Sequence, residues 1–231
     1  MSSAPRKFYE FAAPAQVESG FAVALDGRPI KTPAGKPFRV RTIALAEAVA
    51  AEWNGQGEEI RPASMPLTRM MNVAIDRTPA MRAELIAEIA RYGQTDLLCH
   101  RAESPEKLVA RQAAAWDPWV RWANEAIGFR PEIVIGVRAA ENDVGPIAAA
   151  AAEMDDARLT ALAHAVGLAG SAILALALLD GRIDAETAFA AAALDDLYQL
   201  EVWGEDAEAR ARLDRLKGEF TDLGRFIAAL A

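Results

Sequence analysis

The chain has 231 residues, which is enough for one large or two small domains with an ample apolar core. Its formal net charge of −8 argues against nucleic acid or an anionic membrane as a partner, because both attract a basic protein face. Cys99 is the single cysteine, so intramolecular disulfides are excluded and a reducing compartment is expected.

The N-terminus contains no apolar signal segment. The residues before Lys7 are also too few for a typical transit peptide. This pattern fits a bacterial cytoplasmic protein or an organellar protein that has already been processed.

Residues 21–40 are predicted to form short strands joined by turns. Phe21, Val23 and Leu25 alternate with small residues, which places their side chains on one face of a strand. Asp26–Gly27 indicates a hairpin turn, because both residues tolerate a positive φ. The N-terminal part of the chain is therefore expected to be rich in strands.

A helix is expected to follow this strand-rich part. Thr42 is suited to be its N-cap. Its buried face would consist of four apolar residues, namely Leu45, Ala48, Val49 and Trp53.

The stretch from Glu52 to Arg77 is interpreted as a structural connector between two different halves of the sequence. Glycines interrupt the preceding helical pattern, and Pro66 is suited to the first turn of a new helix because its missing N–H would be unpaired there. The sequence predicts an α+β fold, with a strand-rich N-terminal domain of residues 1–78 and a larger, mostly helical C-terminal domain of residues 79–231.

The second half of the sequence is helical by periodicity, with a brief strand-like run at Ile133–Val137. Residues 95–101 fit a strand or a helix equally, because periodicity does not decide between them in so short an apolar run. Ser104 is expected to cap a helix whose first residue is Pro105, and Pro118 should kink or break that helix. Further helices are expected at residues 78–92, 184–203 and 213–227.

Residues 162–179 are apolar enough to be mistaken for a membrane span. Their number approaches the roughly 20 residues that a bilayer requires. However, about half of them are Ala, Gly, Ser or His, and no aromatic belt flanks them. We expect a single buried helix, on which Gly167 and Ser171 share a face and allow a neighbouring helix to approach closely.

Few residues suit catalysis or the binding of a cofactor or metal. His164 lies in the apolar segment and is interpreted as a core histidine, while the adjacent Cys99 and His100 should point apart and form a poor catalytic pair. Gly35–Lys36 lacks the rest of the phosphate-binding motif, and the chain lacks the ligands of a zinc site. No cofactor or metal is expected.

Three carboxylates on the penultimate helix are the remaining candidates. Asp195, Asp196 and Glu201 point in different directions at about 100° per residue, so they do not form an acid–base pair. Glu201 shares a face with Leu194 and Leu197, where a carboxylate is costly to bury without a partner. Either an internal salt bridge or a donor on a partner protein would satisfy it.

Six short motifs follow one another along the chain in a distinctive order. They are Leu25-Asp-Gly-Arg-Pro-Ile-Lys-Thr-Pro-Ala-Gly35, Ala51-Glu-Trp53, Met65-Pro-Leu-Thr-Arg69, Thr95-Asp-Leu-Leu-Cys99, Trp116-Asp-Pro118 and Gln199-Leu-Glu-Val-Trp-Gly204. From about Lys7 to the C-terminal helix, the chain resembles the F-type ATP synthase assembly chaperones that handle the α subunit. It departs from that family at His100, where an aromatic residue is expected, and at Leu197, where an acidic residue is expected.

The resemblance implies a protein that binds the free α subunit, covers the surface that later meets the β subunit, and catalyses no reaction. Bacterial members of the family are cytoplasmic and eukaryotic members act in the mitochondrial matrix. We expect no nucleic acid, no membrane insertion and a monomer when the protein is unbound. The functionally important acidic residue of the family falls on Glu201. The partner-binding residues expected around it are Glu201, Gln199, Trp203, Asp195 and Asp196.

Two other functions stay open on the sequence alone. A carboxylate-using enzyme would need Asp195 or Asp196 to face Glu201 across a cleft, or a bound metal. A membrane-associated assembly factor would use residues 162–179 to sediment with membranes.

Overall fold

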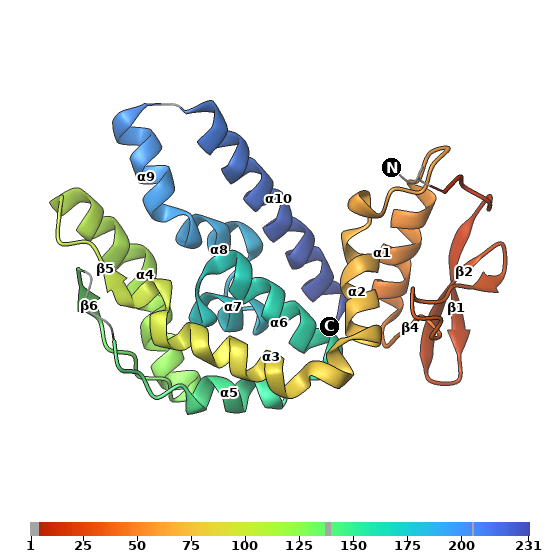
Figure 1. The fold of residues 1–231 in the computed structure, drawn as a ribbon, viewed down its shortest axis with the longest axis horizontal. Helices are drawn as coiled ribbons and strands as arrows, with labels where there is room; N and C mark the ends of the chain where they lie inside the picture. The colour runs from red at the N-terminus through yellow and green to blue at the C-terminus, as the bar shows by residue number, and fades with distance from the viewer. Residues whose placement is uncertain (1–4, 137–139, 205) are drawn as a thin grey trace. The chain divides into compact units, whose positions relative to one another are not determined.

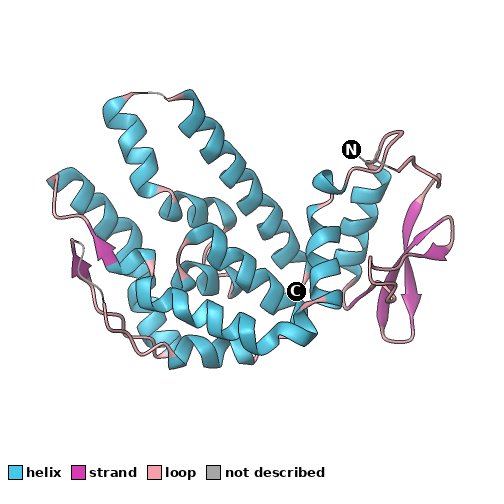
Figure 2. Cartoon of the chain, viewed as in Figure 1, coloured by secondary structure: helices cyan, strands magenta, loops and turns pink. Residues whose placement is uncertain are grey.

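The computed structural model describes residues 5–136, 140–204 and 206–231, and the chain divides into two compact units. The first unit comprises the described residues up to Arg82 together with 156–160 and 225–231, and the second comprises the described residues of 83–155 and 161–224. The fold is α+β as predicted, with a sheet near the N-terminus and a mostly helical remainder (Figures 1 and 2). The boundary between residues 78 and 79 stays a prediction.

The sheet of the first unit is antiparallel and is built around its second strand. Its strands are β1 (Ala12–Val17), β2 (Gly20–Leu25), β3 (Arg28–Pro29) and β4 (Arg39–Val40). Strand β2 pairs with β1, β3 and β4, and the β1–β2 register runs from Ala12 opposite Leu25 to Val17 opposite Gly20. Strand β1 was not predicted, because its alanines and proline have little strand propensity.

The turn at Asp26–Gly27 is confirmed, with φ values of 47° and 81°. The Asp26 carboxylate holds the turn by accepting hydrogen bonds from the backbone N–H groups of Glu10 and Phe11. The alternation of Phe21, Val23 and Leu25 with small residues does not leave the other face of β2 open to solvent. Its residues 22–25 are all buried, which means that both faces of the strand are covered.

Helix α1 (Ile43–Asn54) begins as predicted, with the Thr42 hydroxyl accepting a hydrogen bond from the N–H of Leu45. A 3₁₀ turn, η1 (Pro62–Ser64), leads to α2 (Pro66–Asp76), which has Pro66 in its first turn as expected. Helix α2 packs against α1 within the first unit.

The sequence did not predict that the side chain of Glu52, in α1, has a structural role. Its carboxylate is buried at the start of α2, where one oxygen accepts from Leu67 N at 2.8 Å and the other from Thr68 N at 2.8 Å and Thr68 Oγ1 at 2.7 Å. A negative charge is favoured there because the first N–H groups of a helix are unpaired and its dipole is positive at that end. The Glu-Trp and Met-Pro-Leu-Thr motifs thus form one structural joint.

The second unit is mostly helical, and three helices contribute residues to both units. The shared helices are α3 (Thr78–Tyr92), α6 (Asp156–Ala169) and α10 (Ala207–Ala229). The others are α4 (Glu106–Ile127), α5 (Gly145–Ala152), α7 (Ala172–Leu179), α8 (Ala185–Ala192) and α9 (Leu194–Trp203). Two 3₁₀ turns, η2 (Gly93–Thr95) and η3 (Leu97–Cys99), precede the short parallel pair β5 (His100–Arg101) and β6 (Val134–Ile135). The predicted strand-like run extended to Val137, which lies outside the described residues.

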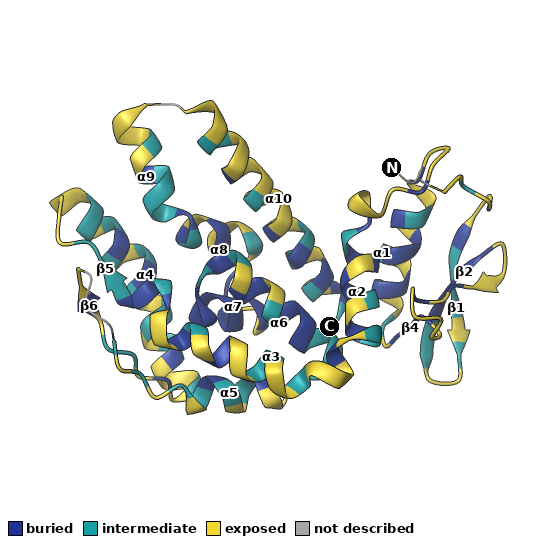
Figure 3. Ribbon diagram, in the orientation of Figure 1, coloured by how far each residue is buried: buried dark blue, intermediate teal, exposed yellow. Residues whose placement is uncertain are grey.

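The apolar segment 162–179 is two helices and not one, so that prediction is wrong. The chain turns at Gly170, which has φ 61°, and Ser171 caps α7 by accepting from Leu174 N at 3.0 Å. Gly167 and Ser171 therefore do not form a packing face, and no atom lies within 4 Å of where a Cβ on Gly167 would stand. Every residue of α7 is buried (Figure 3), and no helix in the described part of the chain is long and apolar enough to cross a membrane.

A second buried carboxylate explains the break between α6 and α7. Asp96 accepts from Leu98 N with one oxygen and from Ile173 N with the other, both at 3.0 Å, and so caps η3 and α7 together. Burial raises the pKa of Asp96 to about 6, since the charged form loses its hydration.

Two helix boundaries in the second unit also differ from prediction. The N-cap of α4 is Pro105 and not Ser104, and the helix continues unbroken across Pro118. The predicted helix over residues 184–203 is divided at Ala193 into α8 and α9. The fully buried Trp116 of α4 donates from its indole to the carbonyl of Ala191 at 2.9 Å, just before this division.

Candidate functional site

The five residues predicted to bind a partner all lie on α9, and we call the surface they form with the neighbouring α4 side chains the α9 surface. It consists of Asp195, Asp196, Gln199, Glu201 and Trp203 of α9 with Lys107 and Arg111 of α4. Both helices belong to the second unit and pack against each other.

Glu201 is held by two cations from α4. Its Oε1 lies 2.8 Å from Lys107 Nζ and 3.0 Å from Arg111 Nη2, while its Oε2 accepts from Arg111 Nη1. These hydrogen bonds, first from Arg111 and then from Lys107, lower the pKa of Glu201 to about 2. The carboxylate is thus charged at any physiological pH.

The premise that Glu201 belongs to a buried apolar stripe is wrong. Its side chain is 46% exposed, whereas Leu194 and Leu197 on the same face are half-buried. Of the two partners considered for it, the structure shows the internal salt bridge. Because this pair is exposed and made by long side chains, it contributes little to stability and can be exchanged for another partner.

Sequence reasoning missed both cations and the aromatic ring beneath one of them. Arg111 lies over the ring of Tyr198, with 5.3 Å between its guanidinium carbon and the ring centroid. Its pKa is raised, chiefly by the hydrogen bond to Glu201. Lys107 and Arg111 are four residues apart on one helix, a spacing that places two cations on one face and could have indicated an acceptor opposite.

The two aspartates of α9 have separate partners. Asp195 accepts from Gln112 Nε2 at 2.8 Å, and Gln112, which is buried, accepts in turn from Ala102 N at 2.8 Å. Asp196 pairs with Arg212 of α10 at 2.9 Å. Asp195 therefore contributes to the packing of α9 on α4, and Asp196 contributes to a surface ion pair.

These three carboxylates do not converge on one reacting position, because each faces a different cation or amide. Over the residues that the structure describes, no three His, Cys, Asp or Glu side chains are grouped as a metal would require. Cys99 is buried, and burial together with the nearby Asp96 raises the pKa of its thiol to about 12. The described side chains of α9 thus offer ion pairs and hydrogen bonds but no converging acid–base pair.

The end of α9 exposes large apolar side chains. Trp203 is 88% exposed and Val202 is 50% exposed, directly beside Glu201 and close to the exposed Gln199. Figure 3 shows this end of the helix as exposed, in contrast to the buried α7. Tryptophan beside charged residues is typical of protein-binding surfaces, since its large ring gains much on burial.

Comparisons with known proteins find similar sequences and similar structures. Residues 6–124 match the family model described as ATP12 chaperone protein. The structure of Atp12 from Paracoccus denitrificans is 40% identical, with a TM-score of 0.92 over 98% of this chain and 99% of that one. A putative chaperone from Agrobacterium tumefaciens is 38% identical, with a TM-score of 0.91 over 98% of this chain and 87% of that one. A mitochondrial atp12 protein of Schizosaccharomyces pombe is 26% identical in an alignment of 225 residues that covers 87% of this chain and 75% of that protein.

Proposed function

Because the chain belongs to the ATP12 chaperone family, we propose that it assists assembly of the F-type ATP synthase by binding the free α subunit until the β subunit replaces it. A subunit of an obligate ring exposes an apolar interface when it is alone, and such surfaces aggregate. The observation that carries the proposal is the exposed Val202–Trp203 pair beside Glu201 at the end of α9.

The proposed recognition has an apolar and an ionic part. Trp203 and Val202 bury apolar area against the client, and Gln199 supplies hydrogen bonds at the edge. A basic or amide group of the α subunit takes the place of Lys107 or Arg111 at Glu201. Exchange of one exposed ion pair for another costs little, which suits a partner that must later be released. Asp195 and Asp196 flank this contact.

The direct test is co-expression of the α subunit alone with the wild-type chaperone or with Glu201→Gln. We expect wild type to keep α soluble and to copurify with it, and Glu201→Gln to retain clearly less α because the neutral amide binds a cation weakly. Glu208→Gln, an exposed glutamate on α10, is the matched control and should behave as wild type. Equal protection by Glu201→Gln and wild type would refute the role of Glu201.

A second variant separates a partner contact from a purely internal salt bridge. Arg111→Gln removes the cation that holds both oxygens of Glu201. If Glu201 pairs with the client, this variant captures α at least as well as wild type, because an internal competitor has been removed. If the internal cluster itself is required, Arg111→Gln loses α just as Glu201→Gln does.

We further propose that the protein is monomeric when unbound and that it catalyses no reaction. It would act in the cytoplasm of a bacterium or, like the relative named as mitochondrial, in that organelle. Failure of a purified monomer to bind α, together with turnover of a small molecule, would favour the carboxylate-using enzyme instead.

A further inference from the structure

A pocket in the first unit is not explained by the α9 surface. It has a volume of about 520 Å³, which is within the range of roughly 300–1,000 Å³ found for ligand sites. Most of its lining comes from residues 25–31, the first part of the first of the six motifs, and the rest comes from Phe8, Tyr9 and Trp53. The Asp26–Gly27 turn accounts for the start of that motif but not for the cations that follow it.

One side of the pocket is aromatic and partly open. Phe8 is 74% exposed and stacks edge-to-face on the buried Tyr9, which makes the same kind of contact with Trp53. The Tyr9 hydroxyl donates to the Trp53 carbonyl and so fixes the two rings together. The buried Nε1–H of Trp53 has no acceptor among the described residues. An exposed aromatic group on a rigid aromatic base is a feature of protein-binding surfaces.

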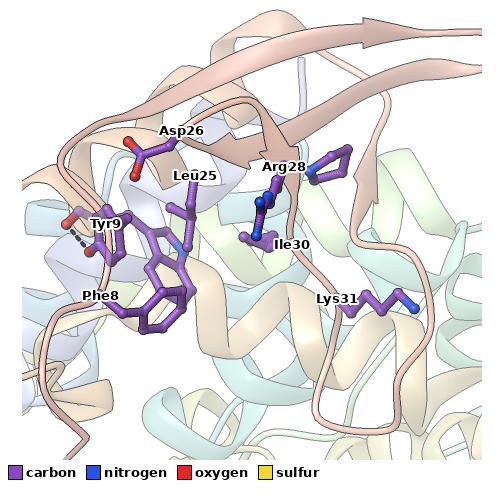
Figure 4. Close-up of a pocket in the computed structure, with 9 residues that line it drawn as sticks. Phe8, Tyr9, Leu25, Asp26, Arg28, Ile30 and Lys31 are labelled. Atoms are coloured by element: carbon purple, nitrogen blue, oxygen red, sulfur yellow. Dashed lines mark hydrogen bonds between the residues drawn. The ribbon is translucent and has the colours of Figure 1, made fainter.

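The other side of the pocket is basic. Figure 4 shows Arg28 and Lys31 on the side away from Phe8 and Tyr9. Neither of these exposed side chains makes an ion pair or hydrogen bond with any described residue. Asp26 also lines the pocket, but its two oxygens accept from backbone N–H groups and it forms no ion pair with Arg28 or Lys31, so the charged residues of the lining keep a net positive charge.

We propose that this pocket binds an acidic peptide segment of a partner protein, with an apolar anchor side chain on the aromatic side and carboxylates facing Arg28 and Lys31. Two unpaired cations beside an apolar surface, on a chain of net charge −8, select a ligand that is both apolar and anionic. Because aromatic and basic side chains occupy opposite sides, the ligand must present its two kinds of group a few residues apart, as an extended peptide does.

The probe is the peptide acetyl-Gly-Phe-Gly-Glu-Glu-Gly-amide, titrated into the full chain while the indole N–H resonance of Trp53 is followed by NMR. A Trp53→Phe variant identifies that resonance. We expect the peptide to shift it, and we expect binding about tenfold weaker when both Glu residues of the peptide are replaced by Gln or when Arg28→Glu and Lys31→Glu are combined. Replacement of the peptide Phe by Ala should also weaken binding.

Matched controls decide the interpretation. Arg39→Glu reverses an exposed cation of the same unit outside the pocket and should leave peptide affinity unchanged. A peptide with Lys in place of both Glu residues should bind the doubly reversed variant better than wild type. Equal binding of the Gln peptide, an equal loss with Arg39→Glu, or a shift of Trp53 by ATP but not by the peptide would each overturn the proposal. The pocket and the α9 surface share no residue, so neither result depends on capture of the α subunit.

Discussion

Three carboxylates, those of Glu52, Asp96 and Glu201, each lie in one of the six short motifs. Glu52 and Asp96 are buried, whereas Glu201 is exposed. Fixed backbone N–H groups satisfy Glu52 and Asp96 at the starts of α2 and α7. Two long, partly exposed cationic side chains satisfy Glu201 at the surface. A buried acceptor cannot leave its donors without loosening a helix, whereas an exposed one can change partner. Burial therefore separates the acids that hold the fold from the acid that can exchange its ionic partner.

The largest expected effect is at Glu52. Glu52→Ala should lower the free energy of unfolding by about 4 kcal/mol, because two backbone N–H groups of α2 and the Thr68 hydroxyl lose a charged acceptor in a buried place. Urea unfolding followed by circular dichroism measures this. Glu47→Ala, an exposed change on the same helix, should stay within about 0.5 kcal/mol of wild type. Similar losses from both variants would show that Glu52 is not a structural acid.

The next effect is the pH dependence contributed by Asp96. Its folded pKa of about 6 exceeds its ordinary value of 3.8, so the folded state binds its proton more tightly than the unfolded state does. Its contribution to stability is therefore complete below pH 3.8 and is lost as pH rises to about 6. A difference of about two pKa units corresponds to about 3 kcal/mol.

The measurement is the unfolding free energy of wild type minus that of Asp96→Asn, since other titrating groups cancel in this difference. We expect the difference to fall between pH 3.8 and 6 and to stay constant above that range. Glu201→Gln should give the opposite sign, because the pKa of Glu201 is lowered from 4.5 to about 2. Its contribution is present above pH 4.5 and is lost as pH falls towards 2. A flat profile for Asp96→Asn would contradict the burial of a titrating acid.

The sequence predicted those parts of the fold that local chemistry decides. The Thr42 cap, the Asp26–Gly27 turn and Pro66 at the start of α2 depend on neighbouring residues only. The break at Gly170–Ser171 was missed because one of the two side chains that cap α7 is Asp96. It lies 77 residues before Ile173, from whose N–H it accepts a hydrogen bond. Strand β1 was missed because pairing with β2 overrides its weak propensity.

The partner-binding role of the α9 residues stays a prediction. Glu201 was singled out both by the family resemblance and by the residue pattern of α9, whereas Trp203 was singled out by the resemblance alone. Lys107 and Arg111 were not found, since they are 94 and 90 residues away from Glu201 in the sequence. Only the packing of α4 on α9 brings these cations to the carboxylate. Periodicity also could not show that the last turn of α9 is exposed.

The smallest effect is expected at Trp203. Its replacement should change the free energy of client binding but not the free energy of unfolding. Trp203→Ala removes an 88% exposed side chain, so the free energy of unfolding should stay within about 0.5 kcal/mol of wild type. If Trp203 is an anchor for the client, loss of its ring costs about 2 kcal/mol of binding, or about 30-fold in affinity. The measurement is the chaperone concentration that keeps half of the α subunit soluble. Phe11→Ala, another exposed aromatic residue, is the control and should leave that concentration unchanged. If both variants protect α equally well, the client does not bind at the end of α9, and the exposed apolar pair there has no part in capture.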